Sequence, residues 1–184
     1  MNMPSYDWKA LKDYCLLETY TTGLGKHGKI LEIACLKVID NQIVDTFHTY
    51  VNPKIHKLAE REKYKEYEIY PTMPEIAPKF LEFVKGFYLV GWNTYVDMYY
   101  LEKDGKFEYK KMVIDVYEPY RRSYKYIASE FYVKTTYEMM YRNSDNYQEL
   151  DFENLIDCCR AVKQLYESQI RYNHFTHVEL PKMR

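Results

Sequence analysis

Two apolar strands joined by a glycine-containing loop, and followed at once by a third strand, restrict the fold of this chain more than any other feature. The first predicted strand covers residues 14–20 and the second covers residues 30–39. Asp40-Asn41-Gln42 predicts a tight turn into a third strand over residues 43–51, which closes at Asn52-Pro53. The sequence therefore predicts a sheet that begins with three antiparallel strands.

The rest of the chain alternates between helical and extended patterns. Apolar residues at helical spacing predict helices over residues 74–85 and 151–172, and a further helix is expected from Asn93 to about Lys103. Short apolar runs predict strands over residues 87–91 and 109–114. This alternation after three antiparallel strands predicts an α/β fold, in which helices flank a mixed five-stranded sheet.

Length and composition limit the remaining possibilities. The 184 residues are expected to form a single domain, residues 1–184, with a core over about residues 13–172. The formal net charge is −1, so any contact with nucleic acid has to come from a local patch. The 22 tyrosines are spread along the chain, which indicates a composition bias more than a dedicated binding surface. Residues 54–70 are charged and weakly periodic, and an exposed excursion with one helical turn is expected there.

The cysteines indicate the redox environment. They show neither C-x-x-C spacing nor the density of a disulfide-rich secreted domain, and they are Cys15, Cys35, Cys158 and Cys159. No apolar run is long enough to span a bilayer, and no signal peptide is expected at the start of the chain. We therefore expect a reduced, cytoplasmic setting and no membrane partner.

The three-strand start resembles that of the DEDD, or DnaQ-like, 3′-5′ exonucleases, the superfamily of the proofreading epsilon subunit of bacterial DNA polymerase III. Members carry D-x-E on the first strand, then T-T-G-L, then I-x-E-I-A on the second strand and V-N-P after the third. Thr21 to Leu24 supply T-T-G-L here, which places the family Asp on Glu18 and the family Glu on Tyr20. The resemblance implies a ribonuclease H-like exonuclease fold over about residues 13–172.

Two later segments match further motifs of the family. The motif H-N-x-x-F-D appears as Trp92-Asn93-Thr94-Tyr95-Val96-Asp97, which keeps Asn93 and Asp97. The motif H-x-A-x-x-D appears as Phe152-Glu153-Asn154-Leu155-Ile156-Asp157, which keeps Asp157 and replaces the general-base His by Phe152. A sister subfamily places a Tyr one helical turn before that Asp, at the position of Glu153.

These motifs imply metal-dependent chemistry. Phosphodiester hydrolysis of this kind uses two divalent cations about 3.5–4 Å apart, held by carboxylates. The resemblance implies that Glu18, Asp97 and Asp157 bind Mg²⁺ or Mn²⁺ if the chain is active, and the absence of any cofactor is the alternative. Glu153 is expected on the same helix face as Asp157, either as a substitute base or as part of a solvated surface. Tyr20 and Phe152 are expected to fill the space of a metal and of the base.

Four residues are candidates for contact with nucleic acid. Thr22 in the T-T-G-L loop and Asn93 occupy family positions beside the acids. Arg121 and Arg122 belong to a basic-aromatic helix face that could touch phosphate, and a solvated charge run is the competing interpretation. Asp115, at the end of the fifth predicted strand, is expected to cap the next helix rather than to bind a metal.

The retained acids and the losses at Tyr20 and Phe152 together predict the function. We expect an exonuclease-like domain with weak or absent catalysis that associates with the 3′ ends of single strands, of DNA or RNA, because a base and its metals act as one unit. One alternative is a working metal-dependent 3′-5′ exonuclease that uses Glu18, Asp97, Glu153 and Asp157. The other alternative is a module that binds only a protein partner.

Overall fold

A five-stranded mixed sheet forms the centre of the molecule. The computed structural model describes residues 11–105, 113–117, 120 and 133–172, and in them the strands follow the order β3-β2-β1-β4-β5. β1 (Tyr14–Thr21) is antiparallel to β2 (Ile30–Ile39), which is antiparallel to β3 (Gln42–Tyr50). β4 (Tyr88–Gly91) is parallel to β1, and β5 (Val113–Asp115) is parallel to β4. The predicted α/β fold with a mixed sheet is confirmed.

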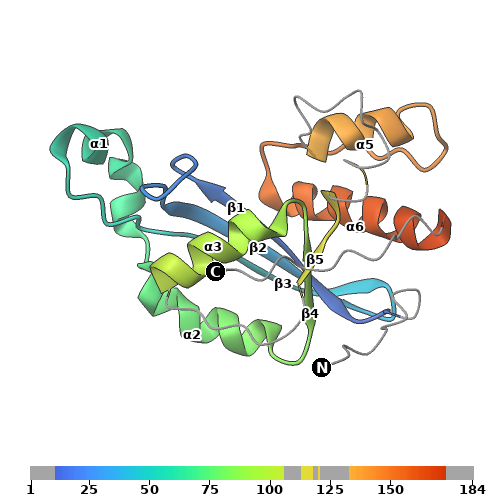
Figure 1. Ribbon diagram of the computed structural model, residues 1–184, viewed down its shortest axis with the longest axis horizontal. Coiled ribbons are helices and arrows are strands. Elements are labelled where there is room, and N and C mark those ends of the chain that lie inside the picture. The colour runs from blue at the N-terminus through green and yellow to red at the C-terminus, as the bar shows by residue number, and fades with distance from the viewer. Residues whose placement is uncertain (1–10, 106–112, 118–119, 121–132, 173–184) are drawn as a thin grey trace.

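Helices cover both faces of this sheet, as Figure 1 shows. On one side lie α2 (Met73–Val84) and α3 (Thr94–Gly105), and on the other lie α5 (Val133–Tyr141) and α6 (Leu155–Tyr172). The connection between β3 and α2 contains α1 (Leu58–Lys63) and the 3-10 helix η2 (Lys65–Ile69). None of the helices within the described ranges has the length and apolar character needed to cross a membrane.

Local signals explain where several elements begin and turn. The hairpin between β2 and β3 turns at Asp40 and Asn41, whose φ angles of 49° and 63° fit the left-handed geometry of a tight hairpin turn. Thr72 precedes α2, and the Glu75 carboxylate accepts hydrogen bonds from the Thr72 N–H at 2.7 Å and from its hydroxyl at 2.6 Å. These signals are short-range, so the sequence is sufficient to locate both elements.

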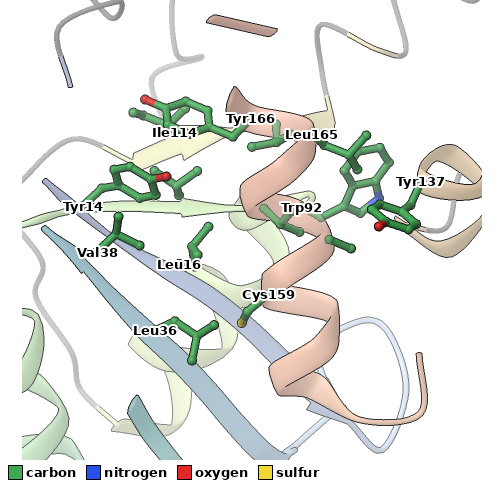
Figure 2. Packing of buried hydrophobic residues seen from close by; sticks show 14 of the residues in the cluster. Tyr14, Leu16, Leu36, Val38, Trp92, Ile114, Tyr137, Cys159, Leu165 and Tyr166 are labelled. Atoms are coloured by element: carbon green, nitrogen blue, oxygen red, sulfur yellow. The ribbon is translucent and has the colours of Figure 1, made fainter. Parts of the chain in front are cut away.

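Two apolar clusters hold the layers together. Alternate residues of β1 point to opposite faces, so Leu16 packs beneath α6 while Leu17 packs against α2 and α3. Figure 2 shows the first cluster, in which Trp92, directly after β4, reaches toward α6 and Tyr137. Phe80 of α2 is fully buried in the second cluster. The strand that carries Glu18 is therefore packed against helices on both of its faces.

Four predictions of element bounds need correction or lie outside the described residues. The last helix begins at Leu155 rather than near residue 151, because the Asn154 Oδ1 accepts the Ile156 N–H at 2.9 Å and so caps the helix there. Residues 54–70 form two short helices, not one turn. α3 continues through Gly105, where a turn was expected after Lys103. Residues 109–112 of the predicted fifth strand lie outside the described residues.

Candidate functional site

Glu18 lies near the end of β1, on the face that α6 covers. Strand alternation puts Glu18 on the same face as Leu16, and its exposed fraction is only 9%. β4 runs parallel to β1, so the residue after β4 comes alongside Glu18, and the Trp92 N–H donates to Glu18 Oε1 at 2.9 Å. The polypeptide backbone itself therefore fixes the direction of this carboxylate.

Asp97 approaches the same end of β1 from the first turn of α3. Its exposed fraction is 5%, and its Oδ1 accepts hydrogen bonds from the Thr19 N–H at 3.1 Å and from the Thr19 hydroxyl at 2.5 Å. Thr19 is the neighbour of Glu18 on β1, so both carboxylates are held at the same end of this strand, Glu18 by Trp92 and Asp97 by Thr19. The sequence did not single out Thr19, since a Thr in a strand carries no functional signal.

Burial makes the charged forms of both acids unfavourable. Burial raises the pKa of Asp97 to about 8, although the two hydrogen bonds from Thr19 oppose this shift. Burial, followed by the charge of Asp97, raises the pKa of Glu18 well above its usual range, and the bond from the Trp92 N–H opposes it. Two such carboxylates titrate as a coupled pair, so their pKa values belong to the pair rather than to either residue alone.

Asp115 is a third carboxylate at this site. It ends β5, and its charge raises the pKa of both Glu18 and Asp97. Its Oδ1 accepts the Asn93 N–H at 3.0 Å and the Tyr117 N–H at 2.9 Å. The bond from the Tyr117 N–H, two residues further along the chain, has the pattern expected if Asp115 caps the next helix. The sequence did not assign Asp115 to the site, although its place at the C-terminal end of a parallel strand was a usable signal.

Asp157 is directed toward its own helix. It lies in the first turn of α6, where its Oδ1 accepts from Arg160 at 2.5 Å and its Oδ2 accepts the Asp151 N–H at 3.1 Å. The neighbouring Cys158 connects it to the other acids, because burial and then the charges of Glu18 and Asp157 raise the pKa of that thiol to about 12. Asp157 thus lies on the Glu18 side of the sheet, with both carboxylate oxygens already bonded.

The structure contradicts the expected place of Glu153. This residue is exposed and lies in the turn before α6, where its N–H donates to Asp151 Oδ1 at 3.0 Å. Because Asn154 caps the helix, Glu153 is outside it and does not share a helix face with Asp157. The i,i+4 relation that would have paired the two carboxylates does not form.

The two substituted positions, Tyr20 and Phe152, differ in exposure. Tyr20 has an exposed fraction of 55%, because it lies at the irregular end of β1 and its ring faces solvent. Phe152 is partly buried and packs against the α6 core, with its ring 5.8 Å from that of Tyr137. The phenol at position 20 prefers a wet surface and the phenyl at position 152 prefers the apolar cluster. That they fill the space of a metal and of the base stays a prediction.

The T-T-G-L loop is fastened to α3. The Tyr100 hydroxyl donates to the carbonyl oxygens of Gly23 at 3.0 Å and of Gly25 at 3.1 Å, and Lys103 Nζ donates to the Gly28 carbonyl. An added Cβ at Gly28 would come within 2.1 Å of the Gly23 carbonyl oxygen, so this position requires glycine. The loop therefore has a fixed shape beside Asp97.

The residues predicted to contact nucleic acid divide into two groups. Within the loop, the Thr22 hydroxyl accepts the Lys29 N–H at 3.0 Å. Asn93 is exposed at the start of α3, with a φ of 56° that turns the chain into the helix. Asn93 lies beside the acids, since its N–H donates to Asp115, whereas Thr22 belongs to the loop that follows β1. The contact of both residues with nucleic acid stays a prediction. Arg121 and Arg122 lie outside the described residues.

The site does not fit the two-cation arrangement that the family resemblance implies. Among residues 11–105, 113–117, 120 and 133–172, no three His, Cys, Asp or Glu side chains are grouped so that they could hold a metal ion. Tyr20 presents a neutral phenol to solvent, and Asp157 is paired with Arg160. The donor set is therefore a buried pair, Glu18 and Asp97, with Asp115 nearby.

Comparison with known proteins gives one family for most of the chain. The family model RNase_T, described as Exonuclease, matches residues 17–155. The chain is 36% identical over 98 residues to DNA polymerase III PolC-type of Clostridium perfringens (strain 13 / Type A), a match that covers 50% of this chain and 7% of the relative. It is 27% identical over 107 residues to DNA polymerase III subunit epsilon of Escherichia coli (strain K12), which covers 50% of this chain and 43% of that protein.

A solved structure extends the likeness to the fold. The nuclease domain of 3'hExo, a DEDDh family member, bound to rAMP, superposes with a TM-score of 0.65 at 14% sequence identity. The superposition covers 89% of this chain and 94% of that domain. At this identity the likeness concerns the fold alone.

Proposed function

This chain belongs to the exonuclease family described by RNase_T, of the DEDD or DnaQ-like kind, and on that premise we propose that it binds the 3′ ends of single-stranded nucleic acid and hydrolyses them weakly or not at all. The observation that carries the proposal is Tyr20, which stands where the family has an acid and has an exposed fraction of 55%. A phenol that faces solvent supplies no charge to steady a divalent cation.

The position of the family base supports the same conclusion. Phe152 packs into the α6 core and has no group that accepts a proton. A general base contributes roughly 10²–10⁴-fold to such a reaction, so its loss alone leaves little turnover. Glu153, the substitute that the sequence suggested, is exposed and lies outside the helix that carries Asp157.

Nucleic acid is the ligand that the family membership favours. The solved domain with the TM-score of 0.65 holds rAMP, and the similar polymerase subunit has a role in DNA synthesis by its name. In this chain the fastened loop at Thr22 and the exposed Asn93 flank the buried acids. Exposed polar groups beside a family site are suited to hold a strand end whether or not it is cleaved.

One observation favours the second candidate, a working metal-dependent 3′-5′ exonuclease. Glu18 and Asp97 are both buried, and burial raises the pKa of each. Buried acids with raised pKa values are costly to the fold and are typical of functional sites. This candidate would use Glu18, Asp97 and Asp157 with Mg²⁺ or Mn²⁺, and Glu153 as its base.

A gain-of-function comparison separates the two candidates. Purified protein is incubated with single strands of DNA or RNA that have a free 3′ end, first with Mg²⁺ and then with Mn²⁺. We expect little shortening by the natural chain. Tyr20→Glu, which restores the missing acid, should raise metal-dependent shortening, whereas Tyr20→Gln, which has the same size and no charge, should not.

The opposite outcome would promote the second candidate. Rapid shortening by the natural chain that is lost in Asp97→Asn would show that the present acids suffice, and Glu153→Gln would then test the substitute base. Binding is measured on the same strands with a free and with a blocked 3′ end. No binding of either strand at low salt would overturn the proposed function and leave the protein-interaction alternative.

A further inference from the structure

Five tyrosines gather beside the candidate site, on the same face of the sheet as Glu18. Tyr20 of β1 pairs with Glu32 of β2, and Glu32 pairs with Tyr50 of β3, so these three residues form one row across the strands. The remaining members, Tyr64, Tyr67 and Tyr70, come from the connection that contains η2. We refer to these five tyrosines as the tyrosine platform.

Ring contacts join the members of the platform. The ring of Tyr50 lies 5.0 Å from that of Tyr70 and 6.0 Å from that of Tyr67, and the Tyr64 and Tyr67 rings are 6.4 Å apart. Tyr20 lies close enough to Tyr67 to influence the pKa of its hydroxyl, which burial raises above its usual range. Rings held in this way lose little freedom when a flat ligand covers them.

The platform is open to solvent and continuous with the site. Tyr20 and Tyr50 have exposed fractions of 55% and 37%. The Tyr64 hydroxyl donates to the Thr22 carbonyl at 3.3 Å, which connects the platform to the T-T-G-L loop. Figure 1 shows α1 beside the end of β1 that leads into this loop. The platform therefore lies next to the loop that follows Glu18 and Thr19 on β1, within the same surface as the candidate site.

The charges around the platform are nearly balanced. Glu32, the acid in the row, is bonded to His48 at 2.7 Å, so the platform does not present a bare carboxylate to a phosphate. Residues 54–70 carry five lysine or arginine and four glutamate side chains, and Arg61 is paired with Glu68. Attraction of the phosphate backbone is therefore weak here, and the rings are the main source of binding energy.

We propose that the tyrosine platform binds unpaired nucleobases of a single strand by stacking, upstream of a 3′ end held at Glu18 and Asp97. This inference rests on the proposed function and adds the part of the strand that is recognised. Aromatic rings stack on every base, so the platform accepts strands of any sequence. It also gives Tyr20 a role of its own in place of the acid that the family has there.

A double-mutant cycle, in which one change is made in the protein and the other in the strand, tests the stacking. Fluorescence anisotropy measures the affinity for a labelled oligothymidine strand and for the same strand with abasic sites. Tyr50→Leu keeps an apolar side chain without a ring and should weaken binding of the intact strand by roughly 5- to 150-fold. Tyr50→Phe keeps the ring and should stay within about twofold of the natural chain, because stacking does not need the hydroxyl.

The abasic strand separates stacking from a structural effect. For the natural chain, removal of the bases should weaken binding at least as much as Tyr50→Leu does, because four other rings also lose their bases. On the abasic strand, Tyr50→Leu should weaken binding no further. Tyr99→Leu is the matched control, since Tyr99 is 41% exposed and lies two residues from Asp97, on the other side of α3. If Tyr50→Leu proves unfolded by circular dichroism, Tyr20→Leu replaces it.

Each outcome has a distinct meaning. If the natural chain binds intact and abasic strands equally, or Tyr50→Leu weakens both by the same factor, the platform is not a stacking site and the proposed function stands. If Tyr99→Leu weakens binding as much as Tyr50→Leu, the stacking inference is likewise wrong. If the natural chain binds no strand at all, both the inference and the proposed function are wrong.

Discussion

Replacement of Asp97 by Asn is expected to stabilise the protein at high pH and to leave its stability unchanged at low pH. Asp97 is 5% exposed, and burial raises its pKa to about 8. Because the folded chain holds this proton more tightly than the unfolded chain, the contribution to stability is complete below the unfolded pKa of about 4. It is lost as the pH rises through about 8.

The size of the effect follows from the shift. Each pKa unit corresponds to about 1.4 kcal/mol, so above pH 8 the charged Asp97 costs the fold on the order of 3–6 kcal/mol. The lower end of this range allows for the coupled titration of Glu18 and for an unpaired amide group in the variant. Asn keeps an Oδ1 that accepts both bonds from Thr19, so the cost of the substitution itself is small.

Urea unfolding at a series of pH values from 4 to 9 measures the difference in the free energy of unfolding. Asp97→Asn and the natural chain should coincide near pH 4 and diverge steadily up to about pH 8, with the variant the more stable. Asp104→Asn is the matched control on the same helix. It loses the ion pair with Lys29 at 2.8 Å and should be less stable than the natural chain at neutral pH.

A difference between Asp97→Asn and the natural chain that does not depend on pH would refute this reasoning, and so would a variant that is less stable at pH 9. The same titration in millimolar Mg²⁺ is informative for function. A cation held by the buried pair would stabilise the natural chain and not the variant.

Two further substitutions test the contacts that position the site. Gly91→Ala should lower the free energy of unfolding, measured in urea, by about 1–3 kcal/mol, because the added Cβ would lie 2.5 Å from the Leu17 carbonyl oxygen and push β4 away from β1. An unchanged unfolding midpoint would contradict this expectation. Tyr100→Phe should speed hydrogen exchange in residues 21–29 while leaving β2 protected, because the two loop carbonyls lose the single hydroxyl hydrogen that they share, a bond worth about 1 kcal/mol. Equal exchange in the loop and in β2 would contradict this expectation.

The sequence was sufficient for the parts of the fold that short-range signals determine. The strands around the Asp40-Asn41 turn and the helix after Thr72 have their turn and capping residues adjacent to them in the chain. Register with T-T-G-L also put Glu18 at the position of the first family acid, and the structure buries that side chain at the end of β1. A motif within one strand and its loop is enough for that result.

The rest of the site depends on contacts between distant residues. The motif alignment put Glu153 one turn before Asp157, but the cap formed by Asn154 starts the helix later. The exposure of Tyr20 accompanies the irregular end of β1, which depends on the pairing with β2 rather than on the residues next to Tyr20. The hydrogen bond from the Thr19 hydroxyl to Asp97 joins residues 78 positions apart, and no local pattern predicts it.

Helix α3 contacts both the acids and the loop of this site. α3 supplies Asp97 to the end of β1 and also supplies Tyr100, Lys103 and Asp104, which fasten the loop between β1 and β2. Any slide of α3 along the sheet would move the acid and the loop together. The loop cannot open as an independent flap while these bonds persist, so any ligand of the site meets a loop whose shape is already set. A change that weakens the packing of α3 on the sheet, such as a smaller side chain at Leu101, should therefore displace Asp97 and the loop together rather than one of them alone.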